Sequence, residues 1–310
     1  MESSQVQLEV TLETLFNYLE IPMNDLPSRG KFYSSAAKIE GRFLTVGDVK
    51  FLSLLMPENA EEIINSILKN CFKFWNMAFD GLLLCDREYL IFWLRANSYT
   101  NESGYSLKVG KCHSCGQSYT HSVELEDVQT NQLDDFEPYV VLPQSQRAVH
   151  LKLPNVASMK IKDEDKDFQL VARMIDCGTM DPKQYLNEFS TYDLAFLIDY
   201  CKSIKVGFDT HFTTVCPKCH ATNEIEAELS DENMFTIHEM HDIIRMTTLI
   251  THNVGVQIPD TYSWPELETL QQVASEIIKN ENDENAKAEN KAKAQAASMA
   301  AKHNIKNVHV

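Results

Sequence analysis

Hydrophobic residues recur along this chain with two different periods, one typical of helices and one typical of strands. Helical spacing predicts amphipathic helices over roughly 58–75, 86–95, 162–176, 231–252 and 264–280. Alternation at period two predicts a short strand over 38–44, a hairpin over 138–154, and strands on both sides of two Cys-x-x-Cys pairs. Helices mixed with local hairpins, without regular strand–helix alternation, indicate an α+β fold.

Short polar signals mark where helices begin. Residues 45–48 and 190–193 have the capping-box pattern, in which a Ser or Thr is followed three residues later by an acid. We therefore expect one helix from 45 to about 56 and another from 190 to about 201. Asp86 is the expected N-cap of the helix that ends near Arg95.

The chain contains 8 cysteines, and four of them form two Cys-x-x-Cys pairs: Cys112 with Cys115, and Cys216 with Cys219. Such a loop between two strands turns both thiols toward one ion, so two loops together complete a tetrahedral zinc shell. We predict one structural zinc ion per chain, bound by all four cysteines. The roughly 100 residues between the pairs then form an inserted subdomain, which is tolerable because loop-closure entropy grows slowly with loop length.

Other interpretations of the cysteines stay open. Redox dithiols are disfavoured because no thioredoxin-like βαβ unit surrounds the pairs, whereas two unlinked thiol pairs are an alternative to the shared site. His113 and His220 lie beside the pairs, and either could replace a thiol as ligand. Four thiolates leave no open position for water or substrate, so we predict no catalytic residue and no enzymatic activity. The remaining cysteines have the spacing of core residues: Cys71, Cys85, Cys177 and Cys201.

A weak internal repeat surrounds the two cysteine pairs. Each pair is preceded by a capped helix and a strand and is followed by a second strand. The two helices share residue types at matched positions, namely Asp86 and Asp193, Leu90 and Leu197, and Ile91 and Ile198. We interpret this pattern as a structural duplication, with chance agreement as the alternative.

Changes of pattern divide the chain into six regions. They are an N-terminal region (1–57), helices with the first cysteine pair (58–127), an inserted hairpin–helix subdomain (128–189), a helix with the second pair (190–230), C-terminal helices (231–280) and a low-complexity tail (281–310). The tail has almost no large apolar side chain, so it is expected to be a solvated helix or disordered. The sequence thus predicts helical elements around a split, zinc-ribbon-like β unit, with an inserted subdomain and a flexible C-terminal tail.

The net charge of −17 narrows the possible partners. An acidic chain repels phosphate backbones, so we expect no broad nucleic-acid binding. No apolar run approaches the roughly 18 residues of a membrane helix, so we expect no membrane span. The N-terminal residues show no secretory signal, which predicts a cytoplasmic location.

The segment Leu26-Pro-Ser-Arg-Gly-Lys-Phe-Tyr33 predicts a turn, because Pro restricts φ and Gly accepts positive φ. It supplies four candidate partner-binding residues, since Arg and Tyr commonly anchor interfaces: Arg29, Lys31, Phe32 and Tyr33. In the alternative interpretation, the two aromatic side chains cap the core and the two basic side chains point to solvent.

Three motifs follow one another along the chain: the turn 26–33, the helix sequence 85–99, and the two cysteine pairs. Their order resembles the baseplate hub proteins and hub assembly factors of T-even-type contractile-tailed bacteriophages, over roughly residues 22–255. The sequence departs from that pattern at Thr100 and His220, where glycine is usual.

The resemblance implies a non-enzymatic structural protein or assembly chaperone. Its expected partners are other phage baseplate or hub proteins, and its expected place is the host cell cytoplasm during tail assembly or the virion tail baseplate. A zinc-ribbon adaptor in nucleic-acid metabolism or transcription is the alternative, which a salt-dependent DNA-binding assay would distinguish. An enzyme would instead need a deep pocket with an open metal position.

Overall fold

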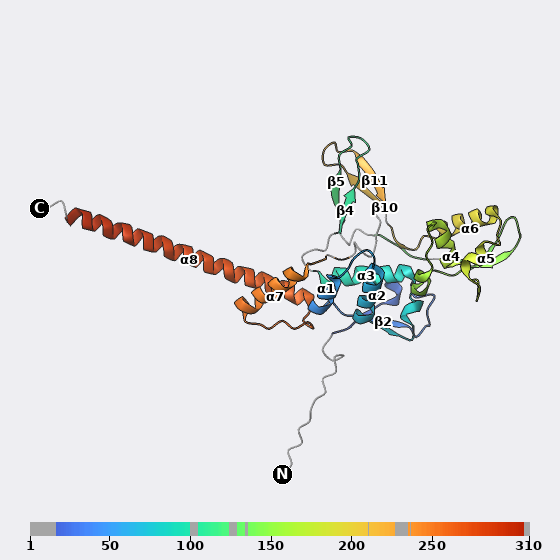
Figure 1. The fold of residues 1–310 in the computed structure, drawn as a ribbon, viewed down its shortest axis with the longest axis horizontal. Helices are drawn as coiled ribbons and strands as arrows, with labels where there is room; N and C mark the ends of the chain where they lie inside the picture. The colour runs from blue at the N-terminus through green and yellow to red at the C-terminus, as the bar shows by residue number, and fades with distance from the viewer. Residues whose placement is uncertain are drawn as a thin grey trace, which may run out of the picture. The chain divides into compact units, whose positions relative to one another are not determined.

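The computed structural model describes residues 17–99, 105–123, 129–133, 136–209, 211–226, 235 and 237–306 (Figure 1). The fold is a mixture of helices and small antiparallel sheets, which confirms the α+β class. The chain divides into two compact units, one formed by residues 1–43 and 55–236 and the other by residues 44–54 and 237–310. Residues 44–54 therefore group with the C-terminal part of the chain, and the finer division into six regions stays a prediction.

The larger unit begins with a three-stranded antiparallel sheet, in the order β1 (Leu19–Ile21), β2 (Lys38–Gly41), β3 (Phe72–Trp75). Helix α2 (Ala60–Cys71) leads directly into β3. The prediction of one helix over 58–75 is therefore wrong at its C-terminal end. The last four residues, Phe-Lys-Phe-Trp, are extended because they pair with β2, and a local helical pattern does not reveal a strand partner from elsewhere in the chain.

Helix α3 (Leu84–Ser98) follows a short 3-10 turn, η3 (Phe79–Gly81). Its N-cap is Leu83, so the prediction that Asp86 caps this helix is wrong. Asp86 is instead the third residue of the helix, and its carboxylate is fully buried. It accepts hydrogen bonds from the backbone N–H and the hydroxyl of Ser28, which lies far away in the sequence.

Between the two cysteine pairs lies a group of short elements with its own core. The predicted hairpin is present as β7 (Tyr139–Val141) and β8 (Ala148–His150), and the elements that follow are η5 (Val156–Lys160), α4 (Lys166–Met174), α5 (Pro182–Leu186) and α6 (Thr191–Ser203). Their apolar side chains form one cluster that includes Val140, Leu142, Val149, Leu151, Val171, Leu197 and Cys201. This cluster gives the residues between the cysteine pairs a packed core, and their forming a separate inserted subdomain stays a prediction.

Side-chain caps start all three α-helices of this group, and the caps of α4 and α6 bear on the predictions. Asp165 caps α4, which is therefore shorter than the predicted helix over 162–176. Ser190 caps α6 and accepts a hydrogen bond from the N–H of Asp193. The Asp193 carboxylate does not complete the capping box, because it accepts hydrogen bonds from the backbone N–H groups of Gln144 and Ser145.

Each cysteine pair lies in the loop of a two-stranded antiparallel hairpin. The first hairpin is β4 (Tyr105–Val109) with β5 (Tyr119–Val123), and the second is β10 (His211–Val215) with β11 (Thr222–Glu226). A further small pairing joins β6 (Thr130–Asn131), which follows the first hairpin, to β9 (Gly207–Phe208), which precedes the second hairpin. The strand, loop, strand pattern predicted around both cysteine pairs is confirmed.

The smaller unit consists of α1 (Val46–Leu52), α7 (Met240–Val254) and α8 (Trp264–Lys306). Helix α1 starts with the predicted capping box at Thr45 and packs against both other helices, and Trp264 at the start of α8 is fully buried. The residues of the predicted tail continue α8 through Lys306, and the side chains from 281 to 295 are all exposed. For residues 281–295, the structure therefore has the solvated helix rather than a disordered segment, and residues 307–310 lie outside the described residues.

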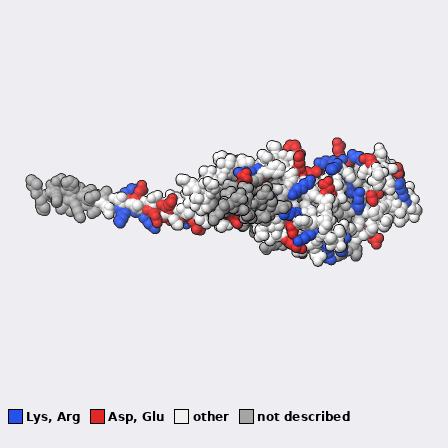
Figure 2. Space-filling model, turned by 90° about the horizontal axis from the view of Figure 1, so that it is seen from below, with Lys and Arg blue, Asp and Glu red and all other residues white. Residues whose placement is uncertain are grey.

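Two surface properties bear on the possible partners. None of the helices among the described residues is long and apolar enough to cross a membrane. On the face of the molecule that Figure 2 shows, basic and acidic side chains are interspersed over the visible residues. A face of this kind presents no broad field of one sign to a charged partner.

Candidate metal centre

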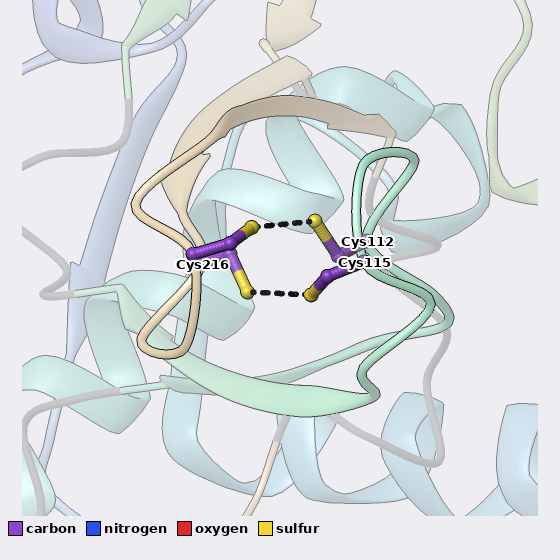
Figure 3. Close-up of side chains that lie close together, drawn as sticks. Cys112, Cys115 and Cys216 are labelled. Atoms are coloured by element: carbon purple, nitrogen blue, oxygen red, sulfur yellow. Dashed lines mark hydrogen bonds between the residues drawn. The ribbon is translucent and has the colours of Figure 1, made fainter.

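The structure brings the four cysteines of the two pairs together. Their sulfur atoms all lie within 4.8 Å of one another, and no other such group of His, Cys, Asp or Glu occurs in the part of the chain that the structure describes. The Sγ atoms of Cys112 and Cys219 are 3.6 Å apart, and those of Cys115 and Cys216 are 3.7 Å apart. Both short distances run between the two hairpins, so the thiols join the hairpins to each other (Figure 3).

The first loop, residues 112–117, holds its thiols by backbone hydrogen bonds. The N–H of Cys112 donates to the carbonyl of Gln117 at 2.9 Å, and the N–H of Gly116 donates to the carbonyl of Cys112 at 2.9 Å. This tight turn requires a left-handed residue, and Gly116 has a φ of 70°. We call this loop the first knuckle.

The second loop, residues 216–221, repeats this geometry and is called the second knuckle. The N–H of Cys216 donates to the carbonyl of Ala221 at 3.0 Å, and the N–H of His220 donates to the carbonyl of Cys216 at 2.9 Å. His220 has a φ of 59° and so occupies the left-handed position that Gly116 occupies in the first knuckle. The sequence departs from glycine here, but the backbone keeps the conformation that glycine favours.

Polar side chains connect the two hairpins beside the thiols. The buried Asn223 of β11 accepts hydrogen bonds through Oδ1 from the backbone N–H of His113 at 3.1 Å and from its ring Nδ1 at 2.9 Å. Asn223 donates through Nδ2 to the hydroxyl of Tyr119 at 3.1 Å, and that hydroxyl also lies 2.7 Å from Thr214 Oγ1. Asn223 therefore fixes the two knuckles relative to each other.

Backbone hydrogen bonds within the knuckles also shift the pKa values of the thiols. The N–H groups of Cys115 and Ser114 point at the Cys112 sulfur and lower its pKa to about 6. The N–H groups of Cys219 and Lys218 lower the pKa of Cys216 in the same way. These two first cysteines of the knuckles thus favour the thiolate, which is the form that binds metal ions.

The second cysteine of the first knuckle behaves differently. The N–H of Gln117 lowers the pKa of Cys115, but burial and the neighbouring thiols outweigh that effect and raise the pKa to about 11. Several thiolates this close together repel one another unless a cation lies among them. The cluster therefore has the charge properties of a site for a cation.

The spacing of the sulfur atoms fits a tetrahedral ion and does not fit disulfides. A zinc ion with four Zn–S bonds of about 2.3 Å places its sulfurs about 3.8 Å apart, close to the 3.6 Å and 3.7 Å seen between the hairpins. A disulfide needs about 2.05 Å, and all four cysteines are free thiols. Cys112 and Cys216 are buried, Cys115 is partly exposed and Cys219 is exposed, so the cluster lies at the surface with one side open.

The two histidines beside the thiols and the four remaining cysteines lie outside the cluster. The His113 ring lies against Asn223 rather than among the thiols, and neither His113 nor His220 belongs to the four-residue cluster. Outside the knuckles, Cys71, Cys85 and Cys201 are buried as predicted for core residues. Cys177 is only partly buried, and its thiol donates to the carbonyl of Met180, so the core prediction is wrong for this residue.

The turn 26–33 lies apart from the thiols and is held by buried polar contacts. The Tyr33 hydroxyl donates to Asp86 and accepts from the N–H of Leu83. Burial raises the pKa of the Asp86 carboxyl, although its hydrogen bonds from Ser28 and Tyr33 work in the opposite direction. Tyr33 thus ties the turn to the start of α3.

The other three candidate residues of this turn lie nearer the surface. Arg29 Nε donates to Gln132 Oε1 at 2.8 Å, and Lys31 Nζ donates to the Leu133 carbonyl at 3.2 Å. Phe32 is 44% exposed and packs edge-on against Phe136. A partner-binding role for Arg29, Lys31, Phe32 and Tyr33 stays a prediction.

Asn223 is a residue of the site that the sequence patterns did not predict. The available signal was its position, because Asn223 and Tyr119 both lie four residues after the last thiol of their pair. A polar amide at a strand position that faces the partner hairpin indicates hydrogen bonds between the two hairpins.

Comparison with known proteins identifies a family for this chain. The family model described as T4 bacteriophage base plate protein matches residues 19–228. This range includes both knuckles, the turn 26–33 and the elements between them. No curated protein and no solved structure matches the chain.

Proposed function

The chain belongs to the T4 bacteriophage base plate protein family, and on that premise we propose that it acts in the hub of the tail baseplate as a non-enzymatic structural or assembly protein stabilised by one zinc ion. Structural baseplate proteins act by binding other baseplate proteins, so its partners are other proteins of the baseplate or hub. It meets these partners in the host cell cytoplasm during tail assembly.

The observation that carries the proposal is the position of four thiols on two facing hairpins. Zinc bound there would be held by Cys112, Cys115, Cys216 and Cys219, and it would supply a cross-link between the hairpins. Four sulfur ligands fill a tetrahedral shell, so the ion offers no position for a substrate. This geometry favours a role in holding the structure together over a role in catalysis.

The energetic consequence of such a site is large. Structural zinc contributes on the order of 10–16 kcal/mol in zinc-finger peptides, whereas whole domains are stable by only about 5–15 kcal/mol. Each hairpin has two strands, and an isolated two-stranded hairpin is marginally stable in water. A zinc ion held by the four thiols would therefore supply the stability that the hairpins lack.

Metal analysis of purified protein tests the site. We expect one zinc per chain in the wild type and none in Cys216→Ser, with a lower melting temperature in the variant. Cys177→Ser is the matched control, because Cys177 lies outside the cluster and should leave zinc content unchanged. Wild-type protein that purifies fully folded without any metal would contradict the proposed site.

Infection experiments test the role in the baseplate. Phage carrying Cys177→Ser should assemble normal tails, and phage carrying Cys216→Ser should accumulate incomplete baseplates. Electron microscopy counts the tails, and mass spectrometry of purified tails and of tail precursors shows at which stage the protein is present. Normal tails from phage that lack the whole chain would refute the structural role.

A further inference from the structure

Two stretches of the chain repeat the same structural plan around their first turn, and we call residues 19–123 the first half and residues 139–226 the second half. In each half, a pair of antiparallel strands is joined through a fully buried leucine that is followed by proline, Leu26 in the first half and Leu142 in the second. Each of these turns contains a left-handed residue, Arg29 with a φ of 54° and Gln146 with a φ of 55°. After the second strand, each half continues with a side-chain capping box that starts a short helix.

Each Leu-Pro turn binds a buried aspartate at the third position of a later helix. In the first half, the N–H of Ser28 donates to Asp86 of α3 at 3.0 Å. In the second half, the N–H of Gln144 donates to Asp193 of α6 at 2.8 Å. Both helices then lead to a knuckle hairpin, so α3 and α6 are equivalent elements, with Asp86 matching Asp193.

One face of α3 is covered by a segment of the second half. Strand β9 packs along this helix, and the Phe208 ring lies 4.0 Å from the Phe92 ring, centre to centre, and stacks on Tyr89 at 6.5 Å. Gly207 passes close to Cys85, where an added Cβ would lie 3.4 Å from the Cys85 Cβ. An extended segment with a glycine followed by an aromatic residue thus covers this face.

The equivalent face of α6 is exposed. The residues that match the covered positions of α3 are Tyr192, Ala195, Phe196 and Asp199, and we call them the open face. Tyr192 is 65% exposed and Phe196 is 37% exposed. Large aromatic side chains side by side on a helix surface are typical of an interaction site rather than of a solvated face.

We propose that the open face of α6 binds an extended segment of another tail protein, and that this segment carries an aromatic residue next to a lysine or arginine. The aromatic residue follows from the equivalence with α3, where Phe208 occupies the same place. The basic residue follows from charge, because exposed Asp199 stands where α3 has Phe92, and the whole chain carries −17. Only the identity of the partner as a tail protein rests on the proposed function.

Photo-crosslinking in infected cells tests the surface directly. A photoreactive phenylalanine analogue replaces Phe196, and in a control protein it replaces Tyr139, an exposed aromatic residue on β7. We expect position 196 to cross-link to a segment of another tail protein that contains an aromatic and a basic residue, and position 139 not to do so. Cross-links from position 196 only to a second copy, or only to residues 1–16 of this chain, would overturn the proposal.

Substitutions test the charge and the aromatic contribution separately. Phe196→Ser and Asp199→Lys should each reduce recovery of the protein with tails or tail precursors by tenfold or more, with zinc content and melting temperature unchanged. Tyr139→Ser should leave recovery unchanged. Normal recovery of both α6 variants, with the wild type still recovered with tails, would overturn the docking proposal but not the proposed function. A cross-link from position 196 to a protein that is not part of the tail, with no wild-type protein recovered with any tail intermediate, would overturn the proposed function.

Discussion

Replacement of Asn223 by alanine should separate the two knuckles without removing a thiol. The Asn223 side chain makes three hydrogen bonds to the first hairpin, two to His113 and one to Tyr119. A buried hydrogen bond contributes about 1 kcal/mol net, so we expect a loss of about 2–3 kcal/mol in the free energy of unfolding, the lower figure applying if water replaces one of the two contacts to His113. For a unit of this size, that loss lowers the melting temperature by roughly 4–12 °C.

The same substitution should weaken zinc binding. Side chains that orient metal ligands commonly change metal affinity by about 10–100-fold when they are removed. Competition with a coloured zinc chelator measures the affinity, and calorimetry measures the melting temperature. Thr222→Ala is the control, because the Thr222 side chain is exposed on the neighbouring position of the same strand. If Asn223→Ala and Thr222→Ala have equal melting temperatures and equal zinc affinities, the assignment of Asn223 as the link between the knuckles is wrong.

Three further substitutions and one deletion give expected outcomes. His220→Gly should raise the free energy of unfolding by about 1 kcal/mol, because glycine adopts the left-handed conformation without the strain that histidine has there. Gly116→Ala should lower the free energy of unfolding by a similar amount. Urea titrations measure both changes, and equal stability of the two variants and the wild type would show that no strain is present. Burial acts to raise the pKa of Asp193, but hydrogen bonds from backbone N–H groups outweigh burial and lower this pKa. The Asp193 carboxylate therefore stabilises the fold above its unfolded pKa, and this stabilisation is lost as pH falls through the lower folded pKa. Melting temperatures of Asp193→Asn should therefore fall less steeply below about pH 4 than those of the wild type, and parallel curves would refute this. Deletion of residues 281–310 should change the melting temperature of the full chain by no more than about 2 °C, since the side chains from 281 to 295 are exposed; a larger fall would show that this part of α8 is packed in solution.

Local sequence was sufficient to predict the two thiol-bearing loops of the candidate metal centre. A Cys-x-x-Cys loop between two alternating segments specifies a knuckle because its hydrogen bonds all lie within six residues, as the contacts from Cys112 to Gln117 and from Cys216 to Ala221 show. The capping box at Thr45 and the hairpin over 138–154 were predictable for the same reason. Each of these features depends on interactions between residues that are close neighbours along the chain.

Contacts between distant residues decided the features that local patterns did not predict. Asp86 has the residue type of an N-cap, but the buried turn with Ser28 binds its carboxylate instead. Residues 72–75 continue a helical pattern, but β2 is available as a neighbour and makes them a strand.

The meeting of the two knuckles is the clearest case of tertiary control. The sequence by itself determined two pairs of thiols that can each supply half of a metal shell. The roughly 100 residues between them had to fold into a subdomain that returns the chain to the first hairpin, and Asn223 then fixes the two loops together. Proximity over such a separation depends on the packing of many intervening residues, which no local pattern encodes.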